Sequence, residues 1–137
     1  MGAMRFSHIG VAVANLERAV EEYRLIFGYQ ILSGPFDDPI QKVSVCFLGT
    51  GTAGDVTIEL VAPASQDSPV NRVLAKSITA YHACYEVDDL DEALVNVRTQ
   101  GCLVISKPTP AVAFTGRRIA WFYTPTRQLI ELVERAG

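Results

Sequence analysis

The tetrapeptide Ile-Glu-Leu-Val occupies residues 58–61 and recurs unchanged at residues 130–133. Upstream of each copy, a histidine begins a strand-like segment: His8 in Ser-His-Ile-Gly-Val-Ala-Val and His82 in Tyr-His-Ala-Cys-Tyr-Glu-Val. The two histidines lie 74 positions apart and the two glutamates lie 72 positions apart. This self-similarity indicates two copies of one module, each with one histidine and one glutamate at matching places.

Both copies predict the element order β-α-β-β-β. Turn residues and caps place strands at 5–13, 29–34, 43–49 and 55–62 in the first copy, with a helix that Asn15 caps and Gly28 ends after Phe27. The second copy has the corresponding strands at 80–87, 102–106, 118–123 and 128–134, with a helix that Asp88 or Asp89 caps and Gly101 ends. A further short strand is predicted at 111–114. The apolar helix faces are Leu16, Ala19, Val20, Tyr23, Ile26 and Phe27 in the first copy, and Leu90, Ala93, Leu94 and Val97 in the second.

These elements predict an α+β fold with a single domain over residues 4–137. Its modules are expected at about 5–62 and 80–135, joined by a linker over 63–79 in which Ser68-Pro69 starts a short helix over about 70–77. We expect Met1-Gly2-Ala3 to be a cloning remnant and exclude it.

Composition narrows the class of function. The net charge of −3 and the absence of a dense basic run argue against a nucleic-acid partner or an anionic membrane surface. No apolar run approaches the roughly 18 residues that a membrane-spanning helix needs. The three cysteines show no metal-binding spacing and predict buried free thiols, as in a cytoplasmic protein.

Strand alternation assigns the repeated residues to faces. In each copy the Ile and Leu of the tetrapeptide share one face, which should pack on the module's helix, while the Glu projects from the other face. A buried carboxylate in a central strand is costly unless it is paired. Glu59 and Glu131 occupy equivalent places, as do His8 and His82. The sequence therefore predicts one partner that all four side chains share.

That partner is predicted to be a divalent metal ion. Two imidazole nitrogens and two carboxylates suit Zn²⁺, Ni²⁺, Co²⁺, Mn²⁺ or Fe²⁺. The alternative is structural, with each histidine hydrogen-bonded in the core and each glutamate at a strand end. Repetition of all four residues favours the metal site.

The chain resembles the vicinal oxygen chelate superfamily, which includes glyoxalase I, methylmalonyl-CoA epimerase and extradiol dioxygenases. The resemblance covers almost all of residues 5–135 and implies a half-open mixed barrel of two modules around the metal, usually in a homodimer. It places the metal ligands at His8, Glu59, His82 and Glu131.

Within the superfamily the chain looks most like the methylmalonyl-CoA epimerases. The matching stretches include Ile-Glu-Leu-Val-Ala-Pro, Gly-Arg-Arg-Ile-Ala-Trp-Phe-Tyr-Thr-Pro and, most particular to that branch, the linker Asp-Ser-Pro-Val-Asn-Arg-Val-Leu-Ala-Lys. The resemblance implies enolisation of an acyl-CoA thioester: a metal polarises the carbonyl and a carboxylate removes the α-proton. Glu131 is predicted to be ligand and base, and Glu59 chiefly a ligand.

Two departures from the epimerases keep other functions open. Ile40 and Gln41 stand where a second acid–base glutamate is usual, and Lys76 to Tyr81 replace a glycine-rich turn. Glyoxalase I, acting on a glutathione hemithioacetal, uses the same His, Glu, His, Glu set and is the main alternative. An extradiol dioxygenase or a non-catalytic resistance protein fits less well, because all four ligand positions are filled.

Three cations are candidates for substrate binding. Arg117 or Arg118 presents a planar fork that suits a carboxylate or phosphate, and only one of these neighbours is expected to face the site. Lys76 is a candidate for a CoA phosphate. The simpler interpretation of all three is solvated surface charge, and that of Trp121 and Phe122 is core filling.

Overall fold

The computed structural model describes residues 2–137, which form two compact units. The first unit is His8–Tyr81, and the second combines Met1–Ser7 with His82–Gly137. Strands β1 (Arg5–Ala12) and β5 (Ala80–Val87) therefore contribute residues to both units. Met1, part of the expected cloning remnant, lies outside the described residues. Nine strands and three α-helices in residues 2–137 confirm the α+β class.

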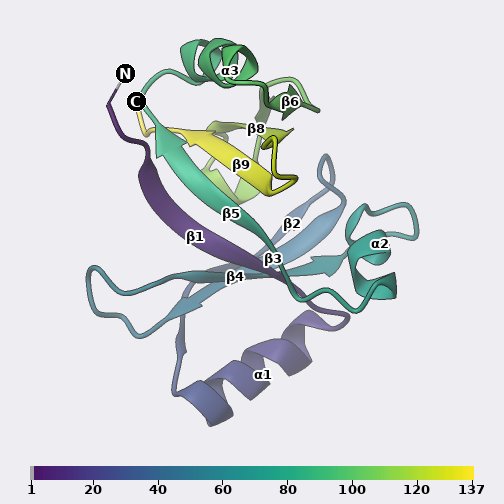
Figure 1. The fold of residues 1–137 in the computed structure, drawn as a ribbon. Helices are drawn as coiled ribbons and strands as arrows, with labels where there is room; N and C mark the ends of the chain where they lie inside the picture. Colours follow the sequence, from purple (N-terminus) through teal and green to yellow (C-terminus); the bar gives the residue numbers. More distant parts are fainter. Residues whose placement is uncertain (1) are drawn as a thin grey trace. The chain divides into compact units, whose positions relative to one another are not determined.

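In the first unit the strand order is β2-β3-β4-β1. Strands β2 (Gln30–Asp38), β3 (Val43–Gly49) and β4 (Ile58–Pro63) are antiparallel neighbours, whereas β1 runs parallel to β4. Helix α1 (Leu16–Phe27) packs against β3 and β4, and the short linker helix α2 (Val70–Ala75) contacts β4 (Figure 1). The linker helix that Ser68-Pro69 predicted is confirmed.

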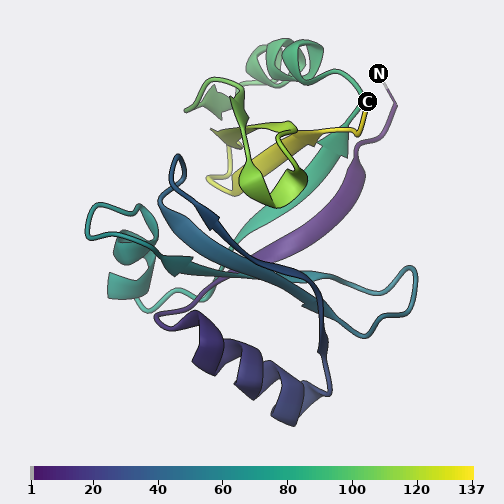
Figure 2. The ribbon, with the colours of Figure 1, turned by 180° about the vertical axis from the view of Figure 1, so that it is seen from behind.

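The second unit repeats this plan with the order β5-β9-β8-β6. Strand β9 (Leu129–Glu134) runs parallel to β5 and antiparallel to β8 (Arg118–Tyr123). The short strands β6 (Leu103–Val104) and β7 (Thr109–Pro110) both pair with β8, and α3 (Leu90–Thr99) covers the sheet (Figure 2). Within each unit the described strands form an open mixed sheet, and neither sheet closes into a barrel.

The helix ends confirm the predicted capping chemistry. The side chain of Asn15 accepts a hydrogen bond from the Arg18 amide at 3.0 Å, and Asp89 accepts one from the Glu92 amide at 3.0 Å. Gly28 ends α1 in the left-handed conformation, with φ of 71°. Capping contacts therefore mark where these two helices begin and where α1 ends.

The core confirms the assignment of faces. Leu60 is fully buried and belongs to the cluster beneath α1 with Ala19, Cys46 and Leu48. Leu132 is equally buried and belongs to the cluster beneath α3 with Ile130 and Phe122. The aliphatic members of each tetrapeptide thus pack on their module's helix, and each glutamate projects from the opposite face of its sheet.

Two predicted elements are wrong. Residues 111–114 were expected to be a strand but form a 3-10 turn over Val112–Phe114, because a loop closes here: the Gly116 amide donates to the Ala111 carbonyl. Strand β2 was expected to end at Gly34 but continues to Asp38. The pairing of β2 with β3 shifts register between Ser33 and Phe36. This irregularity accommodates Gly34-Pro35, and the pairing continues to Asp38.

The predicted packing face of α1 is wrong at its last turn. Ile26 is 69% exposed and Phe27 is 59% exposed, whereas Val20 and Tyr23 pack on the core cluster. Phe27 instead contacts the ring of Tyr23, at a centroid separation of 5.0 Å. The apolar periodicity of α1 continues into its last turn, but that turn does not pack against the sheet.

All three cysteines are free, as predicted, and Cys46 and Cys84 are buried. Burial raises the pKa of the Cys46 thiol, which makes this group a poor nucleophile at neutral pH. None of the helices in residues 2–137 has the length and apolar character needed to cross a membrane.

Candidate metal centre

In the first unit, His8 on β1 and Glu59 on β4 form a buried pair. The parallel register places Gly10 directly beside Glu59, so His8 lies diagonally from the carboxylate. Its Nε2 is 3.2 Å from Glu59 Oε1, and the two side chains are 1% and 7% exposed.

The second unit repeats this arrangement with His82 on β5 and Glu131 on β9. Cys84 lies beside Glu131 in the parallel register, and His82 is again the diagonal neighbour. Its Nε2 is 3.5 Å from Glu131 Oε1, with both side chains almost fully buried. The structure therefore brings the four predicted ligands together as two equivalent pairs, one in each unit.

An aromatic ring accompanies each pair, and sequence reasoning missed this feature. Phe47 on β3 is paired with Glu59, and its ring meets the His8 ring edge to face at 5.2 Å. Trp121 on β8 is paired with Glu131, and its ring meets the His82 ring at 4.8 Å. Trp121 was expected to fill the core with Phe122, but only Phe122 lies in the cluster beneath α3. The signal was present in the sequence, because positions 47 and 121 share the 74-residue offset of the histidines.

The donor atoms of each pair fit a divalent cation. With metal–ligand distances of about 2.1 Å, neighbouring ligand atoms lie about 3.0 Å apart in an octahedral shell and about 3.4 Å apart in a tetrahedral shell. The His8–Glu59 and His82–Glu131 separations of 3.2 and 3.5 Å fall close to this range. Each of the four residues is buried and offers one nitrogen or oxygen ligand atom.

The predicted substrate-binding arginines are both engaged by carboxylates. Arg117 Nη1 donates to Glu86 Oε2 at 3.1 Å and to the Glu134 carbonyl at 3.2 Å. Arg118 donates through Nε to the Glu134 carboxylate at 3.1 Å and pairs with Asp91 at 3.1 Å. The Arg118 hydrogen bonds hold the pKa of Glu134 below its usual range. Arg117 thus links the turn before β8 to β5 and β9. Arg118 links β8 to β9 and to α3.

Lys76 lies at the exposed end of α2, where its amide donates to the Val73 and Leu74 carbonyls. Its side chain is therefore placed as the solvated helix-end lysine that the sequence allowed. A role in binding a phosphate stays a prediction.

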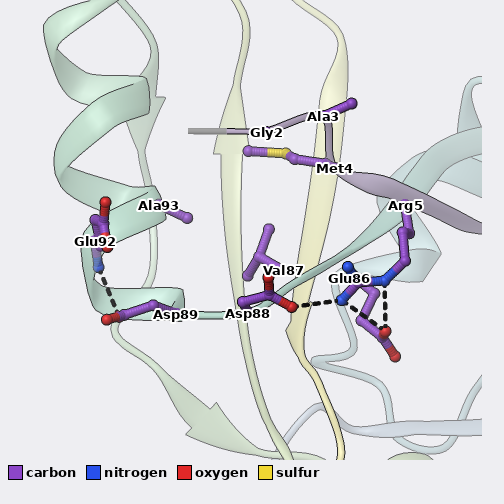
Figure 3. A pocket seen from close by; sticks show the side chains of 10 residues that line it. All are labelled: Gly2, Ala3, Met4, Arg5, Glu86, Val87, Asp88, Asp89, Glu92 and Ala93. Atoms are coloured by element: carbon purple, nitrogen blue, oxygen red, sulfur yellow. Dashed lines mark hydrogen bonds and ion pairs between the residues drawn. The ribbon is translucent and has the colours of Figure 1, made fainter.

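A pocket of about 200 Å³ lies elsewhere in the second unit, between the N-terminal residues, the end of β5 and the start of α3 (Figure 3). Arg5 is one of its lining residues and pairs with Glu86 at 3.0 Å and Asp88 at 2.8 Å. The hydrogen bond from Arg5 and the charge of Arg5 hold the pKa of the Asp88 carboxyl below its ordinary value. Neither His82 nor Glu131 lines this pocket, so it is separate from the candidate metal ligands.

The turn after β2 carries the residues that depart from the epimerase pattern. The buried carboxylate of Asp38 accepts hydrogen bonds from the Ile40 and Gln41 amides, both at 3.0 Å. Ile40 itself is largely exposed. Asp38 is thus occupied in shaping this turn, which puts an apolar side chain where the resemblance expects a carboxylate.

Fold and site together define a duplicated α+β protein in which each module buries one imidazole and one carboxylate on the sheet face opposite its helix. The Glyoxalase/Bleomycin resistance protein/Dioxygenase superfamily matches residues 7–121, and the chain belongs to this superfamily.

Three similar proteins narrow the comparison. The ethylmalonyl-CoA/methylmalonyl-CoA epimerase of Cereibacter sphaeroides is 30% identical over 121 residues, which covers 87% of each chain. A Streptomyces coelicolor methylmalonyl-CoA epimerase variant in complex with 2-nitronate-propionyl-CoA superimposes with a TM-score of 0.82 at 27% identity, covering 99% of this chain and all of the other. The lactoylglutathione lyase GLX1 of Arabidopsis thaliana is 28% identical over 138 residues, covering 96% of this chain but 44% of that protein.

Proposed function

We propose that the two His–Glu pairs together hold one divalent metal ion and that the protein is a metal-dependent isomerase of the epimerase type. The observation that carries the proposal is the exact repetition of a buried imidazole–carboxylate pair in two modules of one superfamily. A carboxylate and an imidazole are retained in a dry site only when a partner offsets their desolvation. A shared cation offsets it for both pairs at once.

A divalent ion held by His8, Glu59, His82 and Glu131 would polarise a substrate carbonyl as a Lewis acid and so acidify the adjacent carbon. Glu131 would take the α-proton on a carboxylate oxygen, and delivery of a proton to the opposite face of the resulting planar carbon would invert it. The burial of Glu131 favours this role, because it keeps bulk water away from the proton transfer. Glu59 serves chiefly as a ligand. His8 and His82 contribute nitrogen ligands, and the strands that carry them fix their places.

We assign an acyl-CoA thioester as the substrate class. The epimerases that are similar to this chain carry methylmalonyl-CoA in their names, and one of them was solved with an acyl-CoA ligand. Arg117, Arg118 and Lys76 are the candidates for contact with substrate anions. For either arginine to serve, its present ion pair must open.

Glyoxalase I chemistry on a glutathione hemithioacetal is the second candidate. A specific observation favours it: both pairs contain a carboxylate, so the full His, Glu, His, Glu set is present. The similarity to a lactoylglutathione lyase supports this alternative.

Proton exchange separates the two functions. The metal-loaded protein is incubated in D₂O with methylmalonyl-CoA and, in parallel, with methylglyoxal and glutathione. Deuterium at the α-carbon of the thioester, detected by mass spectrometry, supports the epimerase type, and lactoylglutathione supports glyoxalase. Absence of both products from metal-loaded protein would contradict both functions.

A cytoplasmic location and a homodimer belong to the same proposal. The free thiols support the first, and family analogy supports the second. Cell fractionation and light scattering on purified protein test them.

A further inference from the structure

The aromatic ring beside each histidine occupies a defined place in the sheet. In the first unit β4 lies between β3 and β1, and in the second unit β9 lies between β8 and β5. Neighbouring strands are about 4.8 Å apart, so the backbones that carry the aromatic residue and the histidine are separated by about 10 Å. The rings nevertheless approach to 5.2 and 4.8 Å. Each aromatic side chain must therefore lean across the strand that carries the glutamate.

This geometry has a physical consequence for the histidine. An imidazole turns about its terminal torsion within a broad well. A large ring held edge to face against it restricts that rotation, at interplanar angles of 79° for Phe47 on His8 and 82° for Trp121 on His82. Edge-to-face contact is a favoured aromatic geometry. The nitrogen that faces the carboxylate is thereby kept in place.

We infer that Phe47 and Trp121 are positioning residues that fix the ring planes of His8 and His82 for metal ligation. The inference rests on the proposed metal site. It goes beyond that proposal because neither aromatic residue offers a ligand atom. Neighbours that orient metal ligands change affinity although they do not touch the ion.

Trp121 gives the sharper test, because the adjacent residue in β8 is a matched control. Phe122 is buried in the cluster beneath α3 and faces away from His82. Trp121→Leu removes the aromatic ring that contacts His82. Phe122→Leu removes an aromatic ring from the other face of β8, which packs beneath α3. Trp121→Phe supplies the ring type that the first unit uses at Phe47.

Titration calorimetry with Ni²⁺ gives the readout, with folding of each variant checked by thermal denaturation. We expect Trp121→Leu to weaken affinity about tenfold, the lower end for loss of an orienting neighbour. Trp121→Phe should restore affinity to near the wild-type value, and Phe122→Leu should leave affinity unchanged although it lowers stability. Equal affinity of Trp121→Leu and wild type, or equal weakening by Phe122→Leu, would overturn the inference.

A second measurement needs no metal. In the metal-free protein the ring current of Trp121 should shift the His82 ring protons, and ring relaxation measured by NMR should show His82 to be less mobile in wild type than in Trp121→Leu. Unchanged His82 mobility would also overturn the inference. Neither readout depends on turnover, so a protein that binds metal but epimerises nothing contradicts the proposed function alone.

Discussion

Removing the divalent ion should lower the melting temperature by about 9 °C. An ion present at a hundredfold excess over its dissociation constant stabilises the folded state by about 2.7 kcal/mol. A chain of 137 residues unfolds with an entropy near 0.29 kcal/mol per kelvin, at about 2.1 cal/mol/K per residue. Dividing the first quantity by the second gives the expected shift. Differential scanning fluorimetry with a chelator, then with Zn²⁺, Ni²⁺, Co²⁺ or Mn²⁺ added back, measures it.

Two ligand variants decide whether the pairs act together. His8→Asn and His82→Asn each replace an imidazole by an amide, which is a weaker ligand for these metals. If one ion is shared, either variant abolishes the metal-dependent shift and the bound metal falls from one ion per chain to none. If each pair binds its own ion, each variant keeps one of two ions. A retained shift in both single variants, or no shift in wild type, would refute the reasoning.

Three further outcomes are expected. Glu131→Gln should slow α-proton exchange at least about 100-fold, the usual contribution of a general base, and full exchange in that variant would remove Glu131 from this role. Asp67 has its pKa lowered from 3.8 to about 2 by hydrogen bonds from Lys42 and Ser65; stability from this contact is therefore complete above pH 3.8 and is lost as pH falls through about 2. The small difference in melting temperature between wild type and Asp67→Asn should accordingly vanish on acidification, and a difference independent of pH would contradict the assignment. Trp121 is the single tryptophan of the chain, so Ni²⁺ should quench its emission and a chelator should restore it; emission insensitive to a metal that calorimetry shows to bind would place the ion away from His82.

Local rules predicted much of the fold because they act over few residues. Asn15 and Asp89 cap helices because a short side-chain oxygen reaches an amide three residues on. Alternation put Leu60 and Leu132 beneath the helices because successive strand residues point to opposite faces. The pairing of each histidine with its own module's glutamate was not predicted, because it depends on the parallel pairing of β1 with β4 and of β5 with β9.

The failures at α1 and β8 have a different cause, namely contacts between elements. Ile26 and Phe27 continue the apolar period of α1, but burial depends on where the sheet lies beneath the helix. Trp121 and Phe122 are adjacent and both aromatic, so composition alone assigns both to the core. Only the pairing of β8 with β9 shows that Trp121 stands opposite Glu131 and shares the face of His82.

The two pairs contain the same residue types but differ in what surrounds them. Gly10 stands beside Glu59 where Cys84 stands beside Glu131. A buried phenyl ring, that of Phe47, covers the first pair, whereas the partly exposed indole of Trp121 covers the second. Duplication accounts for the shared residue types, and it cannot by itself distinguish a proposed ligand from a proposed base. The different chemistry proposed for the two glutamates must therefore originate in these neighbours, and the residues beside Glu131 are the places where substitution should alter proton transfer without altering the number of ligands.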